Sequence, residues 1–371
     1  MRDTKTKRNR VILFLVAATF ASPITIFALC QGEEEKYRKF DGQVYYETDY
    51  PALFSFDSRC RYYTDAQGRW RCEILQSGTL YLPPRSAYQV PKGAPPATFP
   101  AIIINHGSGK EIEADRRYCV IANYFVPKGY IVFVPMRRGQ SNADGSSKST
   151  GIYIEDMVAD WQSASPAWFH DTQCDSGGCY REELFKQQAD QEVVAAVDYL
   201  KSRTDVKSEP KDPEDHRIAI MGSSYGGVVT VFANRRTIGQ KAVVAFSPGA
   251  QQWSDEICGP NEQNCGTPVQ NSLIAAARSA NKPAFYLQAK WDYDTRPTID
   301  LAYAHAYGSN DPKHSRGWNA AIFPYQYPCP TSDPSSCVPK THFQSIHTGF
   351  FTDPGVWGPG VLNFLRRYDV K

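Results

Sequence analysis

The stretch that decides the fold is Arg217-Ile-Ala-Ile-Met-Gly-Ser-Ser-Tyr-Gly-Gly-Val-Val229, in which an apolar run breaks at Gly222-x-Ser224-x-Gly226 and continues as a helix-like segment. This pattern is typical of a nucleophile elbow, where a serine occupies a sharp turn between a strand and a helix. Glycine has no side chain, so the strand and the helix can approach closely on both sides of the turn. Ser224 is therefore the candidate nucleophile, because the residues two positions from Ser223 are not glycine.

A regular alternation of strand and helix patterns surrounds this stretch. Apolar runs with little internal alternation predict strands at residues 101–105, 130–135, 217–221, 242–246, 284–288 and 319–323. Apolar residues at helical spacing predict helices near residues 118–127, 183–202, 225–236, 269–280, 298–307 and 355–368. Strands that are buried on both faces and joined by helices predict an α/β fold, with a mostly parallel, doubly wound sheet and helices on both faces.

The N-terminal segment is unlike the rest of the chain. Residues 1–30 combine basic residues with an apolar stretch over residues 11–30, which predicts a secretory signal peptide cleaved before Gln31. The apolar stretch is also long enough to remain as an uncleaved membrane anchor. Without residues 1–30 the formal charge falls from +2 to −2, so nothing points to nucleic acid. We expect a secreted or periplasmic protein, or one anchored in a membrane and facing an oxidising compartment.

The rest of the chain is expected to form a single domain. Residues 31–40 are interpreted as a charged spacer, and residues 41–371 as one large domain whose Tyr-, Pro- and Gly-rich start forms an edge rather than core. An insertion over about residues 140–182 follows an early parallel strand and is too long for a simple connection. We interpret it as a lid or pocket wall, the alternative being a surface decoration.

Cysteine usage indicates an oxidising compartment. Eight of the ten cysteines fall into sequence-local couples that predict loop-closing disulfides: Cys60 with Cys72, Cys174 with Cys179, Cys258 with Cys265, and Cys329 with Cys337. The couple Cys174 and Cys179 would staple the insertion. Cys119 remains and is interpreted as an unpaired, buried small hydrophobe. Zinc usually needs two closely spaced couples, and only Cys174 and Cys179 come that near, so we expect no metal site.

A reactive serine needs a histidine as base and a carboxylate that orients the histidine. In open parallel sheets such groups gather at the carboxyl ends of the strands. Asp292 and Asp294 directly follow the strand predicted at residues 284–288. We favour Asp292 because it is nearer the end of the strand, while Asp294 could cap the next helix or pair with Arg296.

The histidine base is selected by position. Of the seven histidines, only His342 and His347 lie after the last predicted strand and before the C-terminal helix. A glycine-containing loop directly after His347 would deliver its side chain to the site, so His347 is favoured and His342 is the alternative. Their spacing does not suit a metal-binding pair on one helical face.

The developing negative charge of the reaction must be met by hydrogen-bond donors. The strand predicted at residues 101–105 runs into His106-Gly107-Ser108-Gly109, a loop that could direct the backbone N–H groups of Gly107 and Ser108 at an oxyanion. The backbone N–H of Tyr225, directly after the candidate nucleophile, would be the other donor. The alternative is an ordinary glycine turn.

Taken together, these motifs resemble the α/β-hydrolase superfamily and, within it, the dienelactone-hydrolase-like serine hydrolases. The resemblance covers roughly residues 75–368 and rests on His106-Gly-Ser-Gly109, Arg138-Gly139, Gly222-x-Ser224-Tyr-Gly-Gly227, Gln288-Ala-x-x-Asp292-Tyr, and His347 followed by Trp357-Gly-Pro. It implies an α/β-hydrolase fold and the triad Ser224, Asp292 and His347 in that chain order. Dienelactone hydrolase itself has a cysteine nucleophile, so its lactone substrate does not carry over.

These observations predict a secreted serine hydrolase that cleaves a small-molecule or polymer-derived carboxylic ester through an acyl-enzyme on Ser224. We expect no metal and no organic cofactor. A peptidase or amidase of the same fold is the near alternative, although superfamily peptidases usually carry a large extra domain, for which we find no segment in residues 41–371. A non-catalytic binding protein on a hydrolase scaffold is less favoured, because Ser224 and His347 are both present.

Overall fold

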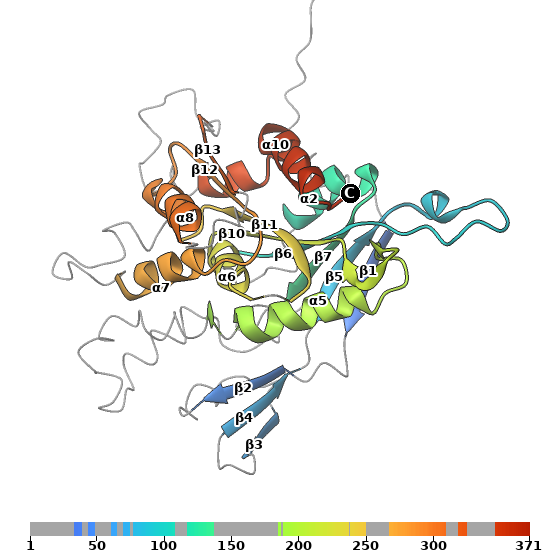
Figure 1. Cartoon of the computed structure of the whole chain (residues 1–371), viewed down its shortest axis with the longest axis horizontal. Coiled ribbons are helices and arrows are strands. Elements are labelled where there is room, and N and C mark those ends of the chain that lie inside the picture. The colour runs from blue at the N-terminus through green and yellow to red at the C-terminus, as the bar shows by residue number, and fades with distance from the viewer. Residues whose placement is uncertain are drawn as a thin grey trace, which may run out of the picture.

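The computed structural model describes residues 33–38, 44–48, 61–64, 70–74, 77–107, 117–136, 185–186, 188–236, 238–249, 267–308, 318–324 and 346–371. Its central sheet has eight strands in the order β1-β5-β7-β6-β10-β11-β12-β13 (Figure 1). These strands are β1 (Glu33–Arg38), β5 (Ser77–Leu82), β6 (Ala101–Asn105), β7 (Ile131–Met136), β10 (Ile218–Ser223), β11 (Gln240–Phe246), β12 (Ala284–Ala289) and β13 (Trp318–Phe323).

Most of the sheet is parallel, as the sequence predicts. β7, β6, β10, β11, β12 and β13 pair in parallel, whereas β5 is antiparallel to both β1 and β7. Side chains of β6 show why the strand patterns lack alternation. Ile103 packs into the hydrophobic core on one face of the sheet and Ile102 into the core on the other, and both are fully buried. A strand with both faces covered is therefore apolar at nearly every position.

Helices cover both faces of the sheet. They are α2 (Arg117–Phe125), α5 (Val193–Lys201), α6 (Tyr225–Ala233), α7 (Thr267–Arg278), α8 (Arg296–Tyr307) and α10 (Pro354–Arg367), with the π-helix η5 (Gln188–Glu192) leading into α5. Residues of α5, α6, α7 and α8 build one core, and residues of α2 and α10 build the other. In Figure 1, α2 and α10 lie above the sheet and α5 and α7 below it. The predicted doubly wound architecture is confirmed.

The region before residue 100 differs from the sequence-based expectation. Within the segment interpreted as a spacer, Glu33–Arg38 forms strand β1 and pairs with β5. β5 is an inner strand, and its Leu80 is fully buried. Residues 77–82 therefore contribute to the core, whereas the sequence pattern predicts an edge. A strand at the edge of a sheet needs only backbone hydrogen bonds and often carries charges, so its composition resembles that of a solvated linker.

Two smaller sheets complete the described strands. β2 (Val44–Thr48), β4 (Trp70–Ile74) and β3 (Arg61–Thr64) form an antiparallel three-stranded sheet, and β8 (Ser208–Glu209) pairs with β9 (Asp212–His216). β9 leads directly into Arg217 and the strand β10, which carries the candidate nucleophile at its end.

Cys119 corrects one prediction. It lies on α2, is 2% exposed and is disulfide-bonded, so its interpretation as an unpaired residue is wrong. Burial alone does not distinguish a packed thiol from a half-cystine, and a distant disulfide partner leaves no mark on local spacing. Cys72 is in β4, where no side chain is described, and the other seven cysteines of the predicted couples lie outside the described residues. The insertion over residues 140–182 and the whole of residues 1–30 also lie outside them.

Within the described ranges, no helix combines the length and the apolar character that crossing a membrane requires. The apolar stretch over residues 11–30 is not part of those ranges. Similarly, no group of His, Cys, Asp and Glu side chains in the described part of the chain is arranged to hold a metal ion.

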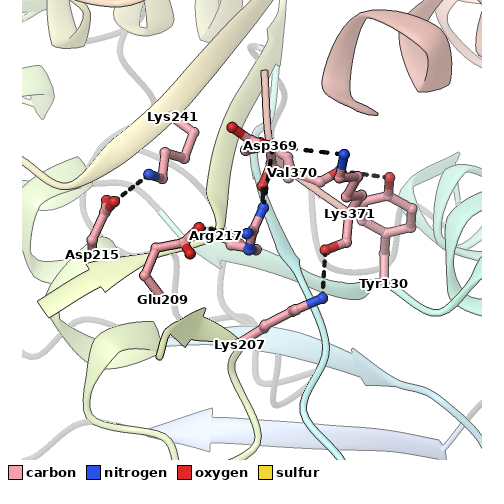
Figure 2. Close-up of polar contacts among 9 residues, drawn as sticks. All are labelled: Tyr130, Lys207, Glu209, Asp215, Arg217, Lys241, Asp369, Val370 and Lys371. Carbon is pink, nitrogen blue, oxygen red and sulfur yellow. Dashed lines mark hydrogen bonds and ion pairs between the residues drawn. The ribbon is translucent and has the colours of Figure 1, made fainter. Parts of the chain in front are cut away.

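The last residues of the chain are held at the amino-terminal end of the parallel strands (Figure 2). Tyr130, just before β7, donates its hydroxyl to the carbonyl oxygen of Val370 at 2.8 Å. Arg217, just before β10, donates to the carbonyl oxygen of Asp369. The side chain of Val370 is fully buried. The chain therefore ends at the amino-terminal end of the parallel strands. The candidate site lies at the opposite end, where the carboxyl ends of these strands meet.

Candidate active site

Ser224 occupies the turn between β10 and α6. β10 ends at Ser223 and α6 begins at Tyr225, so the strand–turn–helix context that the motif requires is present. Ser224 has φ 56° and ψ −120°, a conformation that costs free energy for any residue with a side chain. Its N–H donates to the carbonyl oxygen of Phe246 at 2.9 Å, which fastens the turn to the end of the neighbouring strand β11. Such strain is found where the surrounding structure imposes it, and it presents the serine at the tip of the turn.

The two glycines of the motif are required by close backbone contacts. A Cβ atom at Gly222 would lie 2.1 Å from the carbonyl oxygen of Gly226. A Cβ atom at Gly226 would lie 1.9 Å from the carbonyl oxygen of Asn105, the last residue of β6. Both distances are far below van der Waals contact, and the atoms met belong to the backbone. The glycines thus allow α6 to begin directly beside β10 and β6.

Asp292 and His347 form a buried hydrogen-bonded pair. Asp292 follows β12 and is 4% exposed, and His347 precedes α10 and is 8% exposed. Nδ1 of His347 lies 2.8 Å from Oδ1 and 3.0 Å from Oδ2 of Asp292. Nε2 of the same imidazole is buried and has no hydrogen-bond partner among the described residues. The pair therefore leaves one ring nitrogen available for a group that is brought to it.

The carboxylate of Asp292 accepts two further hydrogen bonds. Ser247, directly after β11, donates its hydroxyl to Oδ2, and the N–H of Tyr293 donates to Oδ1 at 2.7 Å. Burial by itself would raise the pKa of Asp292, but the adjacent His347 and these donors outweigh it and hold the pKa below its ordinary value. The side chain is consequently ionised at neutral pH and can stabilise a positive charge on the imidazole.

Asp294, the other candidate carboxylate, is engaged elsewhere. Its Oδ1 accepts the backbone N–H of Arg296 at 2.8 Å, and its Oδ2 accepts Nε of the same residue at 2.7 Å. Asp294 therefore binds Arg296, the first residue of α8, while Asp292 reaches the histidine. His342, the other candidate base, lies outside the described residues.

The glycine loop after β6 lies beside the elbow. A Cβ atom at Gly107 would be 3.8 Å from Cβ of Ser224, which brings the loop within contact distance of the candidate nucleophile. The N–H of Gly107 donates to the hydroxyl of Tyr118 at 2.9 Å. This donor is thus directed at a side chain of α2 in the structure. The backbone N–H of Tyr225 stands at the first position of α6, and Ser108 lies outside the described residues.

Two residues of the site were missed in the sequence. Ser247 follows the carboxyl end of β11, so the rule that selected Asp292 could also have found it. No signal pointed to Tyr118, because its hydroxyl meets Gly107 only through the packing of α2 against the sheet. Each of the two residues forms a hydrogen bond with a predicted site residue.

The chain is similar to known proteins only among solved structures. No family model and no curated protein sequence matches the chain. An acylaminoacyl peptidase of Pyrococcus horikoshii is 16% identical with a TM-score of 0.40, over 83% of this chain and 44% of the peptidase. Dipeptidyl peptidase 4 of Porphyromonas gingivalis is 16% identical with a TM-score of 0.44, over 79% of this chain and 35% of that protein. An esterase of Pyrococcus furiosus is 16% identical with a TM-score of 0.45, over 88% of this chain and 98% of the esterase.

The chain spans less than half the length of the two peptidases that it matches. All three TM-scores lie below 0.5, so these likenesses do not establish an activity. What the chain can do chemically follows from its own residues.

Proposed function

We propose that the chain is a serine hydrolase of the α/β-hydrolase superfamily that cleaves a carboxylic ester, with Ser224, His347 and Asp292 as its catalytic triad. The observation that carries the proposal is the buried Asp292–His347 pair, whose Nδ1 is hydrogen-bonded and whose Nε2 has no described partner. A histidine arranged in this way is prepared to accept a proton at Nε2. The strained turn at Ser224 supplies the hydroxyl that such a base would activate.

In the proposed reaction, Nε2 of His347 takes the proton of the Ser224 hydroxyl while Oγ attacks the acyl carbon of the ester. Asp292 holds the proton on Nδ1 and stabilises the imidazolium that forms. The backbone N–H groups of Tyr225 and Ser108 are the proposed donors to the oxyanion. His347 then returns the proton to the leaving alcohol. Water, deprotonated by the same nitrogen, attacks the acyl-enzyme and releases the carboxylic acid with the serine regenerated.

The choice of an ester over an amide is supported by the resemblance of the sequence motifs to dienelactone-hydrolase-like enzymes. Hydrolysis outside the cytoplasm is part of the proposal, with the protein secreted, periplasmic or anchored through residues 11–30. It is supported by the N-terminal pattern and by the disulfide at Cys119, since disulfides persist in oxidising compartments.

Labelling with a fluorophosphonate tests the nucleophile. We expect the wild-type protein to form one adduct, mapped by mass spectrometry to Ser224, and we expect Ser224→Ala and His347→Ala to lose it. The matched control is Ser223→Ala, because Ser223 is the adjacent serine and is almost as buried as its neighbours in β10. An adduct on Ser223, or no adduct on folded wild-type protein, would contradict the proposal, and the latter would favour a binding protein on a hydrolase scaffold.

A substrate panel tests the leaving group. Esters of p-nitrophenol with increasing acyl chain length are compared with aminoacyl p-nitroanilides, using the protein that has been shown to label at Ser224. We expect kcat/KM to be higher for the best ester than for every anilide. A clear preference for an aminoacyl anilide would instead identify a peptidase or amidase with the same triad.

A further inference from the structure

Ser247 combines an unfavourable backbone with a buried side chain. It follows β11, is 1% exposed and has φ 46°, a region that favours glycine. Its N–H donates to the carbonyl oxygen of Leu287 at 2.8 Å, which holds its backbone between β11 and β12. Glycine would relieve this strain, so the contacts of the Ser247 side chain are the place to look for a compensating interaction.

The hydroxyl of Ser247 donates a hydrogen bond to Oδ2 of Asp292. The other carboxylate oxygen, Oδ1, already accepts the N–H of Tyr293 and the shorter contact from Nδ1 of His347. Apart from the histidine, Tyr293 on Oδ1 and Ser247 on Oδ2 are the two donors that fix the rotation of the carboxylate about its Cβ–Cγ bond. Without Ser247, only the Oδ1 side of the carboxylate would keep a donor other than the histidine, and the carboxylate would gain freedom to rotate away from Nδ1.

We infer that Ser247 is a positioning residue for the proposed triad: its hydroxyl orients the Asp292 carboxylate so that Nδ1 of His347 keeps its proton and Nε2 remains the basic nitrogen. The inference rests on the proposed function. Asp294 cannot replace Asp292 in this arrangement, because its two carboxylate oxygens are bound to Arg296.

Two substitutions separate the hydroxyl from the backbone. Ser247→Gly removes the hydroxyl and relieves the positive φ, whereas Ser247→Ala removes the hydroxyl and keeps the strain. We expect both to lower kcat for p-nitrophenyl butyrate by about tenfold with KM within about twofold of wild type, because the lost hydrogen bond acts on the base and not on substrate binding. Fluorophosphonate labelling of Ser224 should slow by a similar factor.

The matched control is Tyr130→Phe. It also removes a buried hydroxyl that donates a hydrogen bond, but at the opposite end of the sheet, where it binds Val370. We expect this variant to unfold at a lower temperature with kcat unchanged. Thermal unfolding of all variants shows how much of each is folded, and the downfield proton resonance of Nδ1–H in His347 reports the Asp292 contact directly. That resonance should shift or broaden in Ser247→Gly and remain in Tyr130→Phe.

The outcomes distinguish this inference from the proposed function. If wild-type protein does not label at Ser224, the proposed function fails and the inference fails with it. If wild type labels, and folded Ser247→Gly matches it in kcat and in the imidazole resonance, the inference is wrong while the hydrolase proposal stands. A loss in Ser247→Ala alone would assign the effect to backbone strain and would equally overturn the role of the hydroxyl.

Discussion

Asp292 and His347 stand 55 positions apart in the chain and are joined by a hydrogen bond of 2.8 Å between Oδ1 and Nδ1. The contact brings the end of β12 together with the segment that precedes α10. Because Nδ1 is bound, the ring nitrogen left for chemistry is Nε2, which has no partner in the described part of the chain. The predictions below follow from this pair and from the close approach of Gly107 to Ser224.

Asp292→Asn is expected to lower kcat by about 10³- to 10⁴-fold, because an amide at this position favours the wrong imidazole tautomer. The matched control is Asp294→Asn, which alters a carboxylate of the same loop that binds Arg296. The control should retain kcat within about threefold, since an exposed ion pair contributes little. Steady-state hydrolysis of p-nitrophenyl butyrate measures both. If Asp294→Asn lost more activity than Asp292→Asn, the orienting carboxylate would be Asp294 and not Asp292.

The stability contributed by Asp292 should depend on pH in a defined direction. Its pKa in the folded protein is below the ordinary value of 3.8, so the folded state favours the ionised form. This contribution is fully present above pH 3.8 and is lost as the pH falls through the folded pKa. Urea unfolding should therefore show a gap in free energy between wild type and Asp292→Asn that narrows on acidification below this value. A gap that widens under the same conditions would contradict the direction of the pKa shift.

Tyr118→Phe is expected to lower kcat by about two- to tenfold, because the N–H of Gly107 loses its acceptor and the glycine loop is no longer held against α2. The change leaves the aromatic ring and its packing against Phe351 in place. Steady-state kinetics and fluorophosphonate labelling rates measure the effect, and thermal unfolding checks the fold. An unchanged labelling rate in a folded variant would show that this hydrogen bond does not position the loop.

Gly226→Ala should destabilise the protein by about 3 kcal/mol or prevent folding, because the added methyl group would lie 1.9 Å from the backbone oxygen of Asn105. Backbone atoms cannot move aside as a flexible side chain can. Gly93→Ala is a useful comparison, since a Cβ atom at Gly93 meets nothing within 4 Å and only its positive φ opposes the change. Urea unfolding should place Gly93→Ala much closer to wild type. Equal unfolding midpoints for the two variants would refute the close-contact argument.

Deleting residues 369–371 should lower the free energy of unfolding by about 3 kcal/mol, the sum of the buried Val370 side chain and the hydrogen bonds from Tyr130 and Arg217. The loss occurs at the amino-terminal end of the parallel strands, so kcat per folded molecule should not change. Chemical denaturation and active-site titration with a fluorophosphonate measure the two quantities separately. A fall in kcat with stability unchanged would mean that the C-terminal residues act on the site.

Much of the fold could be predicted because it is local. The apolar run over residues 101–105 corresponds to β6, and the helical spacing over residues 269–280 corresponds to α7, since periodicity follows directly from which faces are buried. β1 was not predicted, because an edge strand is held by backbone hydrogen bonds and these leave no pattern in the side chains. The disulfide at Cys119 was not predicted, because disulfide bonding depends on proximity in space and not along the chain.

The sequence alone determined where a strained turn with a serine must lie, because only glycines at positions 222 and 226 permit the close approach of β10, α6 and β6. It also limited the candidates for the orienting carboxylate to Asp292 and Asp294, which both follow the end of the same strand. The tertiary structure decided between them, bringing Asp292 to His347 and Asp294 to Arg296, and it supplied Ser247 and Tyr118 as supporting residues. Turns and strands follow from neighbouring residues, whereas hydrogen bonds between side chains from different strands and helices exist only after the sheet has assembled.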